Sequence, residues 1–165
     1  MNGSKTDDKV LLIGIGNSSR SDDALGWLFA DQIAGLIGFD VEYRYQLQIE
    51  DAQMVSEHDT VIFVDASREK FESGFSFGPC KPVNSFSFST HRVEPGSLLW
   101  LSRELYGKLP LTFVMAIEGT DWELHEGLSP SAQQNFDRSI RFFKKWLRLS
   151  EQLRVRKQQK DSVAS

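Results

Sequence analysis

The stretch Val10-Leu11-Leu12-Ile13-Gly14-Ile15-Gly16-Asn17 is a short, almost continuous apolar run that contains two glycines and ends in an asparagine. Such runs are typical of strands that are buried on both faces of a parallel sheet. A polar loop follows over residues 17–21, and apolar side chains then recur at intervals of three and four between residues 24 and 36. That spacing predicts an amphipathic helix, for which Ser21 or Asp22 is a suitable N-terminal cap. The chain therefore opens with a strand, a loop and a helix.

The alternation of strand and helix continues through most of the chain. Two further apolar runs predict buried strands, and a segment of alternating apolar and polar residues predicts a half-exposed strand towards the sheet edge. Glu94-Pro95 and Ser129-Pro130 are typical helix starts. The expected strands are 40–48, 60–64, 83–88 and 111–117, and the expected helices are 49–56, 94–106 and a last one from 130 onwards.

This order of elements predicts an α/β fold, a three-layer sandwich with a mostly parallel sheet and helices on both faces. Residues 10–154 are expected to form one domain, because no linker long enough to divide them is visible. Residues 1–9 and 155–165 are expected to be disordered, since they offer few apolar side chains to a core. The segment 67–82 is rich in charge, glycine and proline, and we expect an irregular excursion there.

The composition excludes several classes of protein. The chain has 165 residues, a formal net charge of −4 and 40% hydrophobic residues, whereas a nucleic-acid-binding protein normally shows a basic face. No apolar run approaches the roughly 18 residues of a membrane span. The polar residues 1–9 lack the apolar part of a secretory signal, and a single cysteine, Cys80, suits a reducing compartment. We therefore expect a cytoplasmic protein.

Two local features have ordinary explanations beside functional ones. Cys80 lies between glycine and prolines in what reads as a loop, and this makes it a poor candidate for a nucleophile. Basic residues concentrate between Arg138 and Lys160. They form either a docking surface for an acidic partner or only the solvated face of a helix.

Asp23, Asp65 and His91 each follow closely on a predicted strand. In an open α/β sheet the carboxyl ends of the strands gather side chains from distant segments into one crevice. Taken singly, each residue has a structural explanation: a helix cap, the end of a strand, or the approach to a helix. Together, two carboxylates and an imidazole are suitable ligands for a divalent metal of the nickel or zinc kind. The sequence therefore predicts a metal site at this edge.

Other motifs give weaker signals. Gly14 and Gly16 invite a nucleotide-binding interpretation, but Ser19 stands where the third glycine of that fingerprint is required. His58 precedes a strand and should lie at the opposite edge of the sheet, whereas His125 follows the last strand and is a candidate for contact with substrate or for support of the site. No serine nucleophile elbow and no paired-histidine zinc helix is present in the sequence.

Four segments, in this order, resemble the nickel-iron hydrogenase maturation proteases. The opening strand with Gly-Ile-Gly-Asn and the following Ser21-Asp22-Asp23-Ala24-Leu25-Gly26 are similar to the start of that family. The others are the strand that ends in Asp65-Ala66, the element Ser89-Thr90-His91, and Gly127-Leu128-Ser129-Pro130 before the last helix. The resemblance covers about residues 10–145.

The resemblance implies a phosphorylase/hydrolase-like fold with a five-stranded sheet. It also implies an aspartyl-endopeptidase-like, metal-dependent hydrolase that removes a C-terminal extension from the nickel-loaded large-subunit precursor of a nickel-iron hydrogenase. The family's nickel ligands fall on Asp23, Asp65 and His91, and zinc or cadmium is expected to replace nickel in vitro. Asn17 would then position the loop, and Asp22 would cap a helix or support the site.

One departure from the family pattern keeps an alternative open: residues 45–52 replace a segment rich in glycine and threonine. Asp23 also stands where the family commonly has glutamate, a difference that the metal chemistry tolerates. The alternative is a non-catalytic module that recognises a metalloprotein or a nickel carrier on the same fold. A third possibility is a nucleotide-binding α/β domain.

Overall fold

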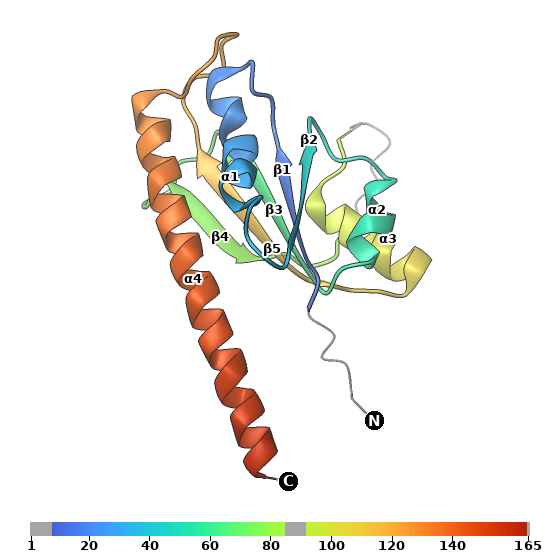
Figure 1. The fold of residues 1–165 in the computed structure, drawn as a ribbon. Coiled ribbons are helices and arrows are strands. Elements are labelled where there is room, and N and C mark those ends of the chain that lie inside the picture. The colour runs from blue at the N-terminus through green and yellow to red at the C-terminus, as the bar shows by residue number, and fades with distance from the viewer. Residues whose placement is uncertain (1–7, 85–91, 165) are drawn as a thin grey trace.

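A computed structural model describes residues 8–84 and 92–164. Its centre is a five-stranded sheet in the order β2-β1-β3-β5-β4, in which β4 is antiparallel to β5 and all other neighbours are parallel (Figure 1). The strands are β1 (Val10–Ile15), β2 (Phe39–Arg44), β3 (Thr60–Ser67), β4 (Phe75–Pro79) and β5 (Leu111–Glu118). The predicted mostly parallel five-stranded sheet is confirmed, with the half-exposed strand β2 at one edge.

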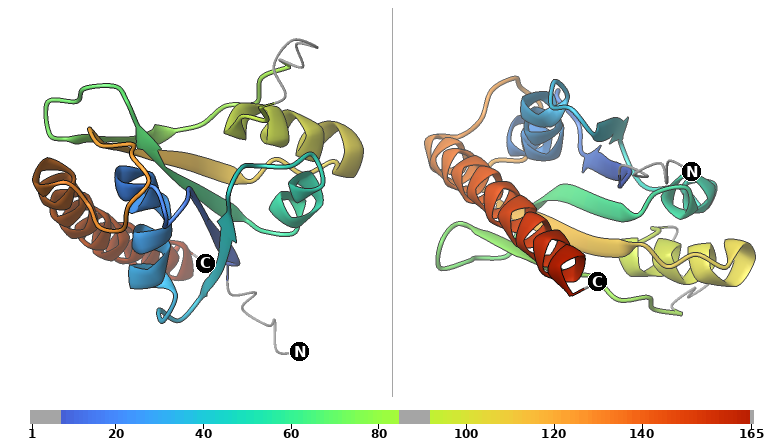
Figure 2. Two further views of the ribbon diagram at one scale, coloured as in Figure 1. Left: turned by 90° about the horizontal axis from the view of Figure 1, so that it is seen from above. Right: turned by 60° about the horizontal axis from the view of Figure 1, so that its bottom comes forward.

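Helices cover both faces of this sheet. They are the short 3₁₀ helix η1 (Ser21–Ala24) and the α-helices α1 (Leu25–Ile33), α2 (Asp51–Ser56), α3 (Pro95–Tyr106) and α4 (Pro130–Val163). Helices α1 and α4 lie on one face, and α2 and α3 lie on the other (Figure 2). The three-layer sandwich is therefore confirmed. Among the described residues, no helix combines the length and the apolar character that crossing a membrane requires.

Two buried clusters, one on each face, explain why the strand sequences are almost continuously apolar. Successive side chains of a strand point to opposite faces, so Leu12 and Ile62 pack beneath α1 and α4, while Leu11 and Phe63 pack beneath α2 and α3. All four side chains are fully buried. Burial of each contributes roughly 1.5–3 kcal/mol. A strand covered on both faces therefore has few positions for a polar residue.

Glycines at two positions let α1 lie unusually close to the sheet. A Cβ atom on Gly26 would collide with the carbonyl oxygens of Ile15 and Val64, and one on Gly14 would collide with the carbonyl oxygen of Gly26. The backbone of α1 therefore rests directly on β1 and β3. This contact fixes the start of the helix, and with it η1, above the ends of the two strands.

The edge strand β4 corrects the expectation of an irregular excursion at 67–82. Phe75 and Phe77 alternate with polar or small residues in it, and their rings lie 5.2 and 5.6 Å from that of Phe142 in α4. The glycine and proline at the end of β4 favour a loop prediction, but both residue types are tolerated in a strand at a sheet edge. Of the strand expected at 83–88, residues 83–84 are not in a strand, and 85–88 lie outside the described residues.

The C-terminal end also differs from the expectation of disorder at 155–165. Helix α4 continues to Val163, although its last turns are fully exposed. Extending a helix that is already anchored avoids the cost of nucleation, and Leu, Arg, Lys and Gln are good helix formers. Residues 1–7 of the expected disordered N-terminus lie outside the described residues, while Asp8 pairs with Arg154.

Candidate functional site

A crevice opens at the carboxyl ends of β1 and β3. From β1 the chain passes through α1 to β2 on one side, and from β3 it passes to β4 and β5 on the other, so the two strands form the switch point of the sheet. Ligands of open α/β sheets bind at such points. The cavity here has a volume of about 670 Å³ and is lined mainly by polar groups from residues 15–23, 65–69 and 92–94, together with Tyr45 and Trp122.

Asp65 lines this crevice on a part of β3 that extends beyond its pairing with β1. The pairing of β1 with β3 ends at Gly14 and Val64, but β3 continues along β5 to Ser67. Asp65 is therefore within the strand and not past its end. Its side chain is 29% exposed, and its carboxylate lies 3.8 Å from the guanidinium of Arg92.

The pKa of Asp65 is raised to about 7. Burial is the largest cause, and the nearby negative charge of Asp23 adds to it, while Arg92 acts in the opposite direction. An acid with this pKa is part protonated and part ionised near neutral pH. It is suited either to exchange a proton during a reaction or to release that proton to a bound cation.

Asp23 reaches the same crevice from the turn that follows β1. The backbone NH of Asn17 donates to the Asp23 carbonyl oxygen at 3.0 Å, and that of Asp23 donates to the Arg20 carbonyl oxygen at 3.0 Å. Gly16 is required here, because a Cβ atom on it would collide with the Asp23 carbonyl oxygen. Asn17 accepts a bond from the NH of Ser19 through its side chain, as expected for a residue that shapes the loop.

Three arginines surround the two carboxylates. Burial raises the pKa of Asp23, and the positive charges of Arg20, Arg92 and Arg68 oppose that rise. Arg68 stacks on the ring of Trp122, with its guanidinium carbon 4.4 Å from the ring centre. These cations keep part of the negative charge of the crevice balanced, and they are also suited to bind an anionic group of a ligand.

His91 lies outside the described residues, so the structure brings together two of the three predicted ligands, Asp23 and Asp65. Arg92, the residue that follows His91 in the chain, lines the crevice. Within residues 8–84 and 92–164 no group of three or more metal-ligating side chains is found. The ligand role of all three residues therefore stays a prediction.

Asp22 lies beside the crevice and binds two segments that are distant in the chain. Its buried carboxylate accepts four hydrogen bonds, from the NH groups of Thr120, Asp121 and Ser129 and from the Ser129 hydroxyl, at 2.7–2.8 Å. Burial would raise the pKa of Asp22, but these bonds outweigh it and hold the pKa below its ordinary value. Asp22 thus joins η1 to the loop that carries Trp122 and to the start of α4.

The expected cap of the first helix is wrong in its details. Neither η1 nor α1 has a side-chain cap, since Ser21 donates instead to the Gly127 carbonyl oxygen and Asp22 binds the distant loop. Ser21 has a φ of 47°, unusual for a residue other than glycine. The residues that Ser21 and Asp22 bind lie about a hundred residues away in the chain. A local sequence pattern cannot predict contacts of this kind.

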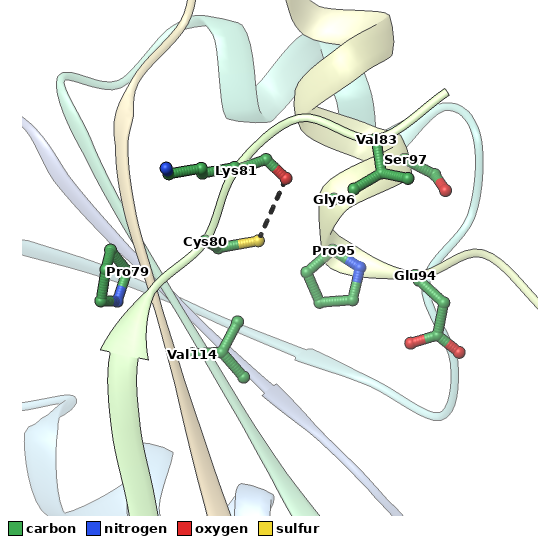
Figure 3. Close-up of a pocket in the computed structure, with 9 residues that line it drawn as sticks. All are labelled: Pro79, Cys80, Lys81, Val83, Glu94, Pro95, Gly96, Ser97 and Val114. Carbon is green, nitrogen blue, oxygen red and sulfur yellow. Dashed lines mark hydrogen bonds between the residues drawn. The ribbon is translucent and has the colours of Figure 1, made fainter. Parts of the chain in front are cut away.

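The remaining candidates do not contribute reacting groups to the crevice. His58 binds Asp40 at the amino end of the sheet, as expected, and His125 bonds to Asp121 at 2.8 Å within the loop before α4. Cys80 lines a separate cavity of about 560 Å³ beside Val114 and Pro95 (Figure 3). Burial raises the pKa of its thiol, and a neutral thiol is a poor nucleophile.

Comparison with known proteins supports the fold. No family model and no curated protein matches the sequence. Solved structures do match: the hydrogenase maturating endopeptidase HybD from E. coli has a TM-score of 0.66 at 17% identity, covering 86% of this chain and 93% of that one. The [NiFe] hydrogenase maturation protease HycI from Thermococcus kodakarensis has a TM-score of 0.63 at 21% identity, with the same coverage. The hydrogenase 2 maturation peptidase from a Thaumarchaeota archaeon has a TM-score of 0.60 at 16% identity, covering 84% and 97%. The chain therefore has the fold of the hydrogenase maturation peptidases, as the resemblance implied.

Proposed function

We propose that this protein is an endopeptidase that removes a C-terminal extension from the nickel-loaded large-subunit precursor of a nickel-iron hydrogenase. The observation that carries the proposal is the meeting of Asp23 and Asp65 in one crevice, at the switch point of a fold shared with hydrogenase maturation peptidases. The proposed location is the cytoplasm, where such a precursor would be met.

The nickel ion in this proposal belongs to the substrate. Asp23, Asp65 and His91 are its proposed ligands, and zinc or cadmium would replace it in vitro. The two carboxylates fit this role, because each has a raised pKa and the charge of Asp23 raises that of Asp65 further. A divalent cation between them would relieve both effects. Carboxylate and imidazole ligands also suit nickel and zinc.

Other residues of the crevice would bind the peptide, and the bound ion would assist its hydrolysis. Asp65 would release its proton when the ion binds, because a divalent cation lowers the pKa of about 7 that burial gives this carboxyl group. The arginines would hold an anionic part of the peptide, and Tyr45 and Trp122 would shape the entrance. Metal bound at the carboxylates would supply carbonyl polarisation or water activation.

Incubation with a nickel-loaded precursor, followed by intact-mass spectrometry, tests the proposal. We expect the precursor to lose a C-terminal peptide, and we expect Asp65→Ala or His91→Ala to slow this loss by more than about 100-fold with the fold intact by circular dichroism. Asp40→Asn, at the amino end of the sheet, is the matched control and should cleave normally. Stable binding of the precursor without a change of mass would instead support the non-catalytic recognition module.

A further inference from the structure

The last part of α4 projects beyond the body of the protein. The helix has 34 residues, which corresponds to a length of about 50 Å. Its first half packs on the sheet through Ala132, Phe136, Ile140 and Phe143, but every residue from Arg148 to Ala164 is exposed. Figures 1 and 2 show this segment extending past the sheet towards the C-terminus. We call residues 148–163 the α4 arm.

An apolar stripe continues from the packed part of α4 onto the arm. Phe142, Trp146, Leu149 and Leu153 follow one another at intervals of four, three and four residues, the spacing of the contact positions of a coiled coil. Leu149 and Leu153 are 50% and 66% exposed. The next positions in the same series are Arg156, Lys160 and Val163. The stripe is therefore apolar near the body and basic with a terminal valine beyond it.

The arm also differs in charge from the rest of the protein. It carries the basic residues Arg148, Arg154, Arg156, Lys157 and Lys160 against the acidic residues Glu151 and Asp161. The whole chain, by contrast, has a net charge of −4. The positive charge is thus concentrated on one projecting helix.

We propose that the α4 arm is a docking site for an acidic amphipathic helix of a partner protein. Such a helix would cover Leu149 and Leu153 with its apolar residues and place carboxylates against Arg156 and Lys160. Helix-on-helix recognition uses this spacing of anchors, and the charges would select the partner. The proposal does not depend on the endopeptidase function.

The same residues argue against two other occupants. A second copy of this chain would bring its own Arg156, Lys157 and Lys160 against a basic arm, and like charges in contact are unfavourable. A membrane surface would favour a wide, uninterrupted apolar face with the basic residues opposite. Here Arg156 and Lys160 interrupt the apolar stripe itself.

The arm lies away from the candidate site. Ser129, at the start of α4, bonds to Asp22 beside the crevice, whereas the arm is at the other end of the helix (Figure 1). A partner held by the arm would leave the crevice open. Docking and any reaction at Asp65 are therefore separable by experiment.

The test uses the full-length protein and a fluorescent 28-residue peptide of four heptads, with leucine at positions a and d and glutamate at e and g. We expect the peptide to bind, and Leu149→Ser/Leu153→Ser and Arg156→Glu/Lys160→Glu each to weaken binding at least about tenfold. Lys144→Glu/Arg154→Glu reverses two charges on the opposite side of the helix, and this control should bind within about threefold of the original protein. A peptide with lysine at e and g should prefer the Arg156→Glu/Lys160→Glu variant.

Several results would overturn the proposal. Absence of peptide binding would do so, as would equal binding by the original protein and both stripe variants. Tighter association of the arm with phosphatidylserine vesicles or with duplex DNA would identify an anionic surface of another kind. Sedimentation of the protein as a dimer that dissociates in the Leu149→Ser/Leu153→Ser variant would identify a second copy as the occupant.

Discussion

Asp22 and Asp23 are neighbours in the chain, yet their carboxylates lie in opposite electrostatic surroundings. Asp22 accepts bonds from three backbone NH groups, which hold its pKa low, whereas burial raises the pKa of Asp23. The first arrangement stabilises a fixed negative charge. The second leaves a carboxylate whose charge is only partly compensated, which is the condition of a group that binds a cation. Adjacent positions thus differ in electrostatics: Asp22 has a structural role, and Asp23 is the one that we propose as a metal ligand.

Asp65 makes the stability of the protein depend on pH. Its pKa is about 7 in the folded protein against an ordinary value of 3.8. Between pH 3.8 and about 7, Asp65 is ionised in the unfolded chain but still protonated in the folded protein. The free energy of unfolding therefore falls as pH rises through this range, and it is constant above about pH 7. Asp65→Asn has no proton to lose. In the presence of a chelator, the free energy of unfolding of this variant should equal that of the original protein at pH 4. At pH 8 it should be larger by about 1–3 kcal/mol.

Thermal unfolding at the two pH values measures this difference. Asp161→Asn, on the exposed α4 arm, removes the same charge and should keep the pH profile of the original protein. A decrease in the stability of Asp65→Asn at pH 8 would show that the carboxylate is not destabilising where it stands.

At the scale of elements, one side chain connects three parts of the fold: η1, the loop before α4 and the start of α4. The Asp22 carboxylate bonds to Thr120, Asp121 and Ser129, which are 98–107 residues away in the chain. Position 119 beside this carboxylate requires a glycine, since a Cβ atom there would lie only 2.8 Å from the Cβ atom of Asp22. The positions of Asp23 and Trp122, which both line the crevice, depend on this connection.

Asp22→Asn should therefore destabilise the protein by about 2–3 kcal/mol at pH 7, because an amide NH₂ would replace an acceptor oxygen among backbone donors. The contribution of Asp22 is present above pH 3.8 and is lost as pH falls through its lowered pKa. Urea unfolding at pH 7 and pH 3 measures both effects. Asp23→Asn is the matched control at the adjacent position and should cost little or nothing; equal losses in the two variants would contradict the assigned difference.

The elements differ in how far the sequence alone reveals them. The buried strands β1, β3 and β5 could be predicted, because burial on both faces leaves mostly apolar residues. The edge strand β4 could not, since it has five residues and ends in glycine and proline. The end of α4 was also missed, because a helix continued from an anchored segment does not need a core of its own.

The presence of Asp23 and Asp65 in one crevice could be predicted from the order of the strands. Asp23 and Asp65 stand out because each follows an apolar run of the sequence, and the sheet topology alone brings the carboxyl ends of such runs together. The arginines and Trp122 could not be foreseen, since their approach depends on the conformation of loops. Asp22 looked like a helix cap, and only its distant partners show that it is the link to α4.

At the scale of the whole molecule, the two ends of the sheet are specialised differently. The carboxyl ends of β1 and β3 hold the acidic crevice, and the α4 arm extends beyond the sheet at the far end of α4 (Figure 1). If both proposals hold, a partner bound to the α4 arm would lie at a distance from the proposed site of cleavage.

The central claim is that Asp23, Asp65 and His91 bind one divalent ion, and titration with Cd²⁺ by calorimetry tests it most directly. We expect one ion per chain, with binding at least about tenfold weaker in each of Asp23→Ala, Asp65→Ala and His91→Ala. His58→Ala is the control, because this histidine binds Asp40 at the other end of the sheet, and it should bind Cd²⁺ as the original protein does. Unchanged affinity in His91→Ala, or no binding by the original protein, would contradict the three-ligand site.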